Sequence, residues 1–359
     1  MYLFKKQKKS QVMKILLALT LLVISSVYSC DLVIRNGEGL NRLSDVIEDS
    51  KTQKKICFDG VNRVESFEIP TSAGNVVFTS LNPGKPAVIT ASASLNKWYR
   101  CNDGLHCPTN EWNEVWVHYV SDIENLTDSY LPPRQLFVNG TRVSRVTRTG
   151  DTMGWIPTSN GYAKISGNAS NDLVENQLEL RWPRSVKNWI EPRCIVTAVD
   201  GANITIDPKC WSDLIQRNGN KLPGLPTFVE NVFEPPGPNE FVATREYIFY
   251  RPASSKPYDA PVNAFVPSAA NIFSAKNLNN HTFSNLIFQH ASWRVPSMSG
   301  GYVPTQTLVT DRFGEPLGAI QIDTSQQIVV EDCVFENIGA AYVKSFSLFL
   351  SFTHSHIHT

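Results

Sequence analysis

The sequence lacks the short motifs by which several enzyme classes are recognised. It has no CxxC metal knuckle, no glycine-rich phosphate loop and no nucleophile elbow. These absences disfavour a zinc knuckle, a P-loop nucleotide hydrolase and an α/β-hydrolase. The alternating His354, His356 and His358 lie in low-complexity sequence, and we expect no metal site there.

Acidic residues are missing from the N-terminus. An apolar run over residues 15–24 and the small-residue pattern Val27-Tyr28-Ser29 come before the first acid, Asp31. The basic residues ahead of that run are Lys5, Lys6, Lys8, Lys9 and Lys14. This order is typical of a signal peptide cleaved after Ser29, and the run is short for a bilayer. We therefore expect a secreted protein without stable membrane insertion, residues 1–29 being the leader.

Excess positive charge is also missing from the rest of the chain. Without the five leader lysines, 28 Lys and Arg face 33 Asp and Glu, a net charge of −5. That balance argues against nucleic acid as a partner. The 359 residues are 42% hydrophobic and 18% charged, enough for one large or two medium domains.

A repeat of short strands is the strongest pattern present. Residues 319–322, 328–330 and 333–335 are apolar, with polar corners between them, and Ile320 and Val343 lie 23 residues apart. Residues 281–290 align with 328–337, which matches Asn285 with Asp332 and Phe288 with Phe335. Short strands repeating every 20–30 residues indicate a solenoid. We read the 47-residue offset as about two coils, with Phe313 between, and predict a right-handed parallel β-helix with an inward phenylalanine ladder.

The same rhythm divides the chain into segments. Residues 30–91 predict an amphipathic cap helix within 37–50 and the first coils, with strands at 56–58, 66–69, 76–79 and 87–90. Residues 92–226 hold seven of the eight Trp and hairpin signals such as Asn139-Gly140, which predicts an inserted, mostly antiparallel β domain. We expect coils again over 227–343. Residues 344–359 are Ser/Phe/His-rich, and we expect an atypical tail in place of the true final coils.

Seven cysteines in a secreted chain favour disulfides. Cys194 and Cys210 flank a hairpin pattern symmetrically, so we expect them to pair across it. Cys101 and Cys107 bracket a loop that allows a local pair. The partners of Cys30, Cys57 and Cys333 stay open, with a Cys30–Cys57 pair and a buried Cys333 thiol compatible with the pattern. Glycosylation sequons occur at Asn125, Asn139, Asn168, Asn203 and Asn280.

The chain resembles the secreted right-handed β-helix proteins of the pectin lyase-like superfamily. It is most similar to the type with an inserted β domain, related to glycoside hydrolase family 141. The resemblance spans about residues 35–343 and rests on these segments: 134–140 with Arg142 and Arg145, 228–231, 236–241, 247–252, 288–290 with Trp293, and 332–340. It implies a polysaccharide or glycan partner, a monomer and catalytic carboxylates from middle and later coils.

Glycoside hydrolysis needs two carboxylates flanking the bond. The candidates are Asp311, Asp323 and Glu336, with His290 and Trp293 as a sugar-binding platform. For each carboxylate the alternative is a solvated turn residue, and for His290 it is a packed ring bonded to a backbone carbonyl. We thus expect a polysaccharide-binding hydrolase without a cofactor. The alternatives are a non-catalytic polysaccharide-binding or surface protein, and a polysaccharide lyase, which would use calcium.

Overall fold

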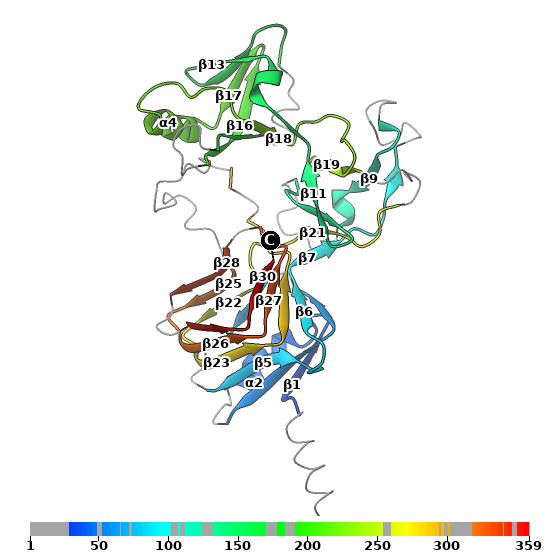
Figure 1. Ribbon diagram of the computed structural model, residues 1–359, viewed down its shortest axis with the longest axis vertical. Coiled ribbons are helices and arrows are strands. Elements are labelled where there is room, and N and C mark those ends of the chain that lie inside the picture. The colour runs from blue at the N-terminus through cyan, green and yellow to red at the C-terminus, as the bar shows by residue number, and fades with distance from the viewer. Residues whose placement is uncertain are drawn as a thin grey trace, which may run out of the picture.

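The described part of the protein is built around five β-sheets (Figure 1). The computed structural model describes residues 29–48, 52–64, 66–71, 74–101, 107, 112–123, 132–169, 178–183, 191–253, 260–293, 296–297, 301, 318–339, 341–346 and 350–358. Within these ranges three sheets contain only parallel strand pairs and two are mainly antiparallel. The described part of the chain is all-β, with short helices between some of its strands.

The three parallel sheets form one unit, here called the parallel body, at the bottom of Figure 1. One sheet has the order β1 (Leu32–Arg35), β2 (Lys54–Asp59), β5 (Val76–Ser80), β23 (Asn279–Ser284), β26 (Gln326–Glu331) and β29 (Leu350–Thr353). A second has β28 (Ala341–Phe346), β25 (Gly318–Asp323), β22 (Phe273–Lys276) and β4 (Phe67–Ile69). The third has β3 (Val61–Arg63), β6 (Ala87–Thr90), β24 (Leu286–Gln289), β27 (Val334–Glu336) and β30 (His356–His358).

From β22 to β30 the chain visits these three sheets in turn, three times over. Each return places a strand in parallel register on the strand of the previous round. Ile320 pairs with Val343, which confirms the 23-residue repeat read from the sequence. The alternating burial of strands such as β5 and β24 explains the pattern, because one side chain in two points into the shared core.

Aromatic rings stack inside the parallel body. Phe288 and Phe335 are buried, pair in register and have ring centroids 5.1 Å apart, which confirms the predicted ladder. Phe78 and Phe283 stack likewise at 4.9 Å. The predicted spacing of two rounds was wrong, because β24 and β27 are direct neighbours in their sheet. Phe313, expected between them, lies outside the described residues.

Polar residues with left-handed backbone turn the corners between strands. Asn285 joins β23 to β24 with φ 53°, and Asp332 joins β26 to β27 with φ 49°. Asn and Asp adopt this conformation more readily than other side chains, because their short polar groups bond to nearby backbone. The two residues aligned in the sequence therefore occupy the same corner in successive rounds.

The predicted cap helix is present at the N-terminal end but is shorter than expected. A 3₁₀ turn, η1 (Leu40–Arg42), leads into α2 (Leu43–Glu48). Leu43 and Ile47 are buried and join the core of the parallel body. The helix therefore covers apolar side chains that β1 and β2 would otherwise leave open at the end of the stack.

Two further sheets lie above the parallel body and make up the β7–β21 segment (Figure 1). The larger has the order β7 (Ser92–Ser94), β21 (Ala264–Pro267), β10 (Leu136–Val138), β11 (Thr141–Arg145), β19 (Glu240–Ala243), β20 (Tyr247–Arg251), β9 (Trp116–Tyr119) and β8 (Tyr99–Arg100). The other has β12 (Thr147–Arg148), β18 (Phe228–Glu230), β15 (Glu179–Arg181), β16 (Arg193–Asp200), β17 (Asn203–Ile206), β14 (Gly161–Lys164) and β13 (Trp155–Thr158). The helices of this segment are η3 (Val120–Asp122), η4 (Gly150–Met153) and α4 (Pro208–Arg217).

Parallel coils do not resume at residue 227 as expected. Strands β18 to β21 belong to the two mainly antiparallel sheets, and the first returning strand of the parallel body is β22. Residues 241–250 belong to an antiparallel hairpin of β19 and β20. Their short, continuous apolar runs suit either kind of pairing.

The C-terminal stretch also differs from expectation. Strands β28, β29 and β30 pair in parallel with β25, β26 and β27, so residues 341–346 and 350–358 continue the three sheets. The Ser/Phe/His composition still alternates apolar and polar positions, which is what a strand requires. Among the described residues no helix is long and apolar enough to cross a membrane. Of the expected leader, residues 1–29, all but Ser29 lie outside the described residues.

Candidate functional site

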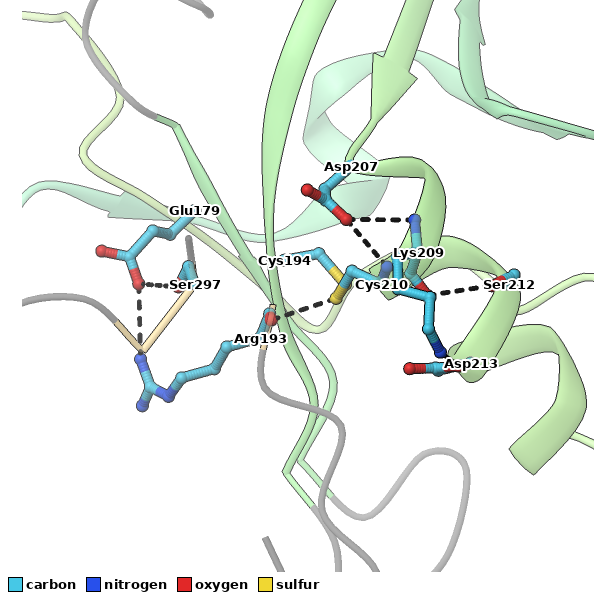
Figure 2. Close-up of a disulfide and its surroundings, with 9 residues drawn as sticks. All are labelled: Glu179, Arg193, Cys194, Asp207, Lys209, Cys210, Ser212, Asp213 and Ser297. Carbon is cyan, nitrogen blue, oxygen red and sulfur yellow. Dashed lines mark hydrogen bonds and ion pairs between the residues drawn. A yellow bond between two sulfur atoms is a disulfide. The ribbon is translucent and has the colours of Figure 1, made fainter. Parts of the chain in front are cut away.

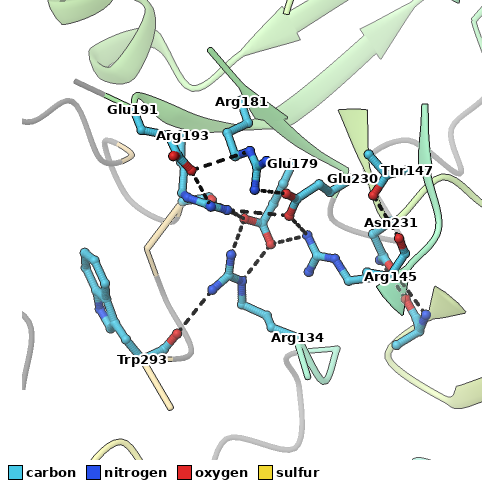
Figure 3. A network of polar contacts seen from close by, with 12 residues as sticks. Arg134, Arg145, Thr147, Glu179, Arg181, Glu191, Arg193, Glu230, Asn231 and Trp293 are labelled. Atoms are coloured by element: carbon cyan, nitrogen blue, oxygen red, sulfur yellow. Dashed lines mark hydrogen bonds and ion pairs between the residues drawn. The ribbon is translucent and has the colours of Figure 1, made fainter. Parts of the chain in front are cut away.

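A cluster of arginines and glutamates is buried in the β7–β21 segment (Figure 3). Glu179 is at its centre, with a side chain only 6% exposed. Arg134 donates two hydrogen bonds to it, each 2.7 Å long, from Nε and Nη2 to the two carboxylate oxygens. Arg145 donates a third at 2.7 Å, and the Ser297 hydroxyl a fourth at 2.5 Å. This carboxylate is thus fully hydrogen-bonded inside the protein.

Glu230 lies beside Glu179, and both contact Arg145 and Arg193. Arg181 Nη1 lies 2.7 Å from one of its oxygens, and Arg145 Nη2 lies 3.0 Å from the other. Arg193 Nη1 lies 3.5 Å away. The outer member of the cluster is Glu191, which Arg193 contacts at 2.7 Å.

The strand register brings these charges together. In β15 the buried Leu180 faces the core, so Glu179 and Arg181 project to the opposite side. Glu179 lies across from Glu230 on β18, and Arg181 across from Arg193 on β16. Like charges directly opposite are unfavourable in a sheet, but the diagonal ion pairs between the two rows compensate for both contacts.

The arginine side of this cluster opens into a cavity of about 700 Å³. Its wall includes Arg134, Arg142, Arg145, Arg181, Arg193 and Glu230 from the β7–β21 segment. Trp293, Ile338 and Gly339 close it from the parallel body. A smaller cavity of about 360 Å³ adjoins it and shares Gln135, Arg142 and Ile338. The cavity therefore forms where the two parts of the molecule meet.

Gly339 allows this close approach. A Cβ atom there would lie 2.4 Å from Gln135 Nε2 and 2.6 Å from Ser292 Oγ. Its amide donates to the carbonyl of Ala291 at 2.8 Å. The corner after β27 can pack against the residue that precedes β10 only because it carries no side chain.

A disulfide lies next to Arg193, one of the arginines of this cluster (Figure 2). Cys194 follows Arg193 in β16 and is bonded to Cys210 in α4. The Asp207 side chain caps α4 by accepting from the amides of Lys209 and Cys210. The expected pair is present, but it joins a strand to a helix instead of crossing the hairpin, because β17 ends at Ile206 and Pro208 begins a helix.

The other cysteines are also placed. Disulfides join Cys101 to Cys107 and Cys30 to Cys57. Cys333 is a buried free thiol in the core of the parallel body. Burial raises the pKa of the Cys333 thiol to about 12, which leaves it unreactive as a nucleophile. Three disulfides fit an extracellular protein.

The electrostatics of Glu179 determine what it can do. Burial alone would raise the pKa of this carboxyl, but Arg134 and Arg145 outweigh that effect and hold it well below its usual range. A group of this kind stays ionised and does not serve as a proton donor at neutral pH. It acts instead as the anchor that fixes the orientation of the surrounding guanidinium groups.

The carboxylates predicted from the sequence lie elsewhere. Asp323 ends β25 and Glu336 ends β27, in different sheets of the parallel body, and no described interaction joins them. Glu336 accepts a hydrogen bond from Gln289, its neighbour in register. Asp323 accepts from Gln321 at 3.0 Å. Asp311 lies outside the described residues.

His290 and Trp293 do not form one platform. His290 is 6% exposed and is enclosed by Phe137 and Phe265, with Nδ1 3.0 Å from the Thr90 hydroxyl. It is a packed histidine, although its partner is a side chain and not the backbone carbonyl considered above. Trp293 is half-buried and lines the arginine cavity, where its carbonyl accepts from Arg134 at 3.3 Å.

The sequon asparagines within the described ranges, Asn139, Asn168, Asn203 and Asn280, are all exposed. Asn125 lies outside those ranges. No group of three or more metal-ligating side chains occurs among the residues that the structure describes.

Sequence reasoning did not identify the arginine cluster as a site. Arg142, Arg145 and Glu230 all fall in segments used for the resemblance, but no role was assigned to them. The available signal was local: two charged residues flank a buried leucine in Glu179-Leu180-Arg181. Such a strand must place its charges on one face, and they then need partners.

Comparison with known proteins gives little further guidance. No protein-family model matches the chain, and no curated protein matches it. A solved structure described as the complex of XylC with xylose superposes with a TM-score of 0.36 and 12% sequence identity. The match covers 80% of this chain and 36% of that one. The functional inference therefore rests on the chemistry of the cavity.

Proposed function

We propose that this chain is a secreted, monomeric right-handed parallel β-helix protein that binds a polysaccharide. In this proposal the parallel body is the solenoid, strands β7 to β21 form an inserted domain, and residues 1–29 are a cleaved signal peptide. Glycans on the exposed sequons, such as Asn168 and Asn203, belong to the same proposal. No cofactor is needed for binding.

The observation that carries the proposal is the cavity between the β7–β21 segment and the parallel body. Its volume of about 700 Å³ falls within the usual range for ligand sites, roughly 300–1,000 Å³. It combines a half-buried indole, Trp293, with a dense set of hydrogen-bond donors. An aromatic face suits the C–H face of a sugar ring, and fixed donors suit its hydroxyl groups.

Binding is better supported than hydrolysis. Hydrolysis needs a proton donor beside a second carboxylate. At this cavity Glu179 is held ionised by Arg134 and Arg145, and Glu230 is engaged by three arginines. Glu179 therefore does not serve as the proton donor, and both Glu230 oxygens contact guanidinium groups. The non-catalytic alternative from the sequence is therefore the one proposed.

The test is a binding screen of the secreted protein on plant, fungal and animal polysaccharides, with release of reducing ends measured in parallel. We expect retention by at least one polysaccharide without turnover. Trp293→Ala should weaken it about tenfold or more, whereas Tyr99→Ala, an exposed aromatic away from the cavity, should leave it unchanged. Retention of none of them, or equal binding by Trp293→Ala, would refute the assignment.

A further inference from the structure

The charges around the cavity do not balance. Five arginines, Arg134, Arg142, Arg145, Arg181 and Arg193, contribute to its wall. The carboxylates in contact with them are Glu179, Glu230 and Glu191. Five cations and three anions leave two positive charges in excess among these residues.

The carboxylates of Glu179 and Glu230 already have arginine partners. Glu179 accepts from Arg134 and Arg145, and Glu230 contacts Arg145, Arg181 and Arg193. All four of these guanidinium groups are held by glutamates of the cluster. The cluster therefore has no carboxylate left for a fifth arginine.

Arg142 is that fifth arginine. It projects from β11 opposite Phe137, is exposed, and has no hydrogen bond or ion pair with any residue that the structure describes. It lies at both the larger and the smaller cavity. Loss of surrounding water, followed by the repulsion of Arg134, lowers its pKa. The guanidinium stays charged all the same, because the pKa of arginine starts so high.

A cationic site with a free guanidinium at its mouth selects for an anion. A carboxylate or a sulfate offers the paired oxygens that a guanidinium binds with two parallel hydrogen bonds. A neutral sugar would leave the excess charge uncompensated inside a partly dehydrated cavity. The fixed glutamates prevent the other arginines from reorienting, so the site is preorganised for such a group.

We propose that the cavity binds an acidic glycan, and that Arg142 engages the carboxylate or sulfate group of one of its sugars. This inference rests on the proposed function, since it specifies the ligand class of the same cavity. Trp293 contacts the sugar ring and Arg142 contacts its charge. The two contributions are separable by substitution.

The experiment compares three oligosaccharide sets of equal length by calorimetry: oligouronates, the same oligouronates with their carboxyl groups reduced to alcohols, and sulfated oligosaccharides. Wild-type protein is expected to bind a carboxylated or sulfated set at least tenfold more tightly than the reduced set. That preference should shrink as salt is raised. The two anionic sets show which group the cavity takes.

Arg142→Gln should lose about tenfold in affinity for the preferred anionic set and little for the neutral one. The matched control is Arg245→Gln, an exposed arginine in the β19–β20 turn, which should bind as wild type does. A thermal melt checks that both variants fold. Equal affinity for charged and neutral sets, or anion binding unaffected by Arg142→Gln, would overturn the acidic-glycan inference and leave Trp293-dependent sugar binding intact. Failure of all three sets to bind would overturn the acidic-glycan inference, and the proposed function would fall with it only if the polysaccharide panel also retained no protein.

Discussion

The parallel body and the β7–β21 segment bury different kinds of side chain at their centres. In the parallel body, Phe288 lies on Phe335 and Phe283 on Phe78, and the core is almost wholly apolar. In the β7–β21 segment, apolar clusters surround a buried carboxylate, Glu179, with arginines around it. Apolar stacking stabilises in proportion to buried area and is indifferent to pH. A buried ion cluster contributes orientation instead, since desolvation offsets most of its attraction.

This contrast teaches where binding chemistry is placed in the molecule. A repeating apolar stack makes each round like the last and leaves little room for a singular arrangement of charges. The β7–β21 segment is not bound by the repeat, so it brings residues from β11, β15, β16 and β18 to one point. The parallel body then supplies the opposite wall of the cavity.

The largest effect is expected from the aromatic stack. Phe335→Ala should reduce the free energy of unfolding by about 3–5 kcal/mol, because a fully buried ring is removed and its cavity stays. Val334→Ala, on the outward face of the same strand, should cost less than about 1 kcal/mol. Urea titration at low and high salt measures both. If the loss caused by Phe335→Ala depended strongly on salt, the core of the parallel body would not be stabilised by apolar contacts alone.

A somewhat smaller loss is expected at the buried carboxylate. Glu179→Gln leaves Arg134 and Arg145 without their charged partner, and should cost about 3 kcal/mol. The control is Glu191→Gln, whose side chain is 43% exposed and whose loss should cost under about 1 kcal/mol.

The pH dependence of the same carboxylate has a definite sign. The folded protein holds the pKa of Glu179 low, so its stabilising contribution is complete above its unfolded pKa, roughly 4.3. That contribution is lost as pH falls further, toward the folded pKa. Wild-type stability should therefore decline more steeply below about pH 4.3 than that of Glu179→Gln. Identical acid profiles would show that the glutamate carries no buried charge.

The smallest predicted effect is a change of stability with pH caused by His290, which lies where the two regions meet. Burial, and then the charge of Arg63, lowers the pKa of His290 to about 4, against 6.5 when unfolded. Below pH 6.5 the unfolded chain therefore takes up a proton that the folded chain does not, and stability falls until about pH 4. Between pH 7 and 4.5 this amounts to roughly 2 kcal/mol.

A substitution separates the contribution of His290 to this pH dependence of stability from the contributions of the other histidines. His290→Gln should flatten the stability profile over this pH interval, while His118 and His281, whose pKa values are also lowered by burial, keep their own contributions. The measurement is the unfolding free energy at several pH values for both proteins. An unchanged slope would mean that His290 is not held neutral between Phe137 and Phe265.

Much of the parallel body could be predicted from the sequence, because its signals are local. Alternating burial marks each strand, and polar corners such as Asn285 and Asp332 recur where the backbone must turn. The limits of the body were harder to predict. The strands of the β19–β20 hairpin are short continuous apolar runs, as fully buried parallel strands also are, so periodicity could not distinguish parallel from antiparallel pairing.

The candidate site was beyond sequence reasoning for a different reason. Its charges come from residues between Arg134 and Glu230, and only the register of β15 with β16 and β18 brings them together. Spacing along the chain carries no trace of that convergence. The same holds for Trp293, which reaches the cavity from the parallel body, while His290, three residues earlier, is buried.

One feature of the topology bears on how the chain folds. Strands β6 and β24 pair although Ala87 and Leu286 are about 200 residues apart, a contact of very high order. The β7–β21 segment lies between them, and it leaves and re-enters the parallel body through two antiparallel neighbours, β7 and β21. The Ser268 amide and the Ala91 carbonyl are only 2.9 Å apart.

If β7 and β21 pair first, the effective loop between Ala87 and Leu286 shrinks from about 200 residues to about 25, which lowers the entropic cost of closure by about 2 kcal/mol. The β7–β21 segment, which lines most of the cavity, would then also assist folding by holding β6 and β24 close together. The β7–β21 segment would then form before the strands of the parallel body pair across it.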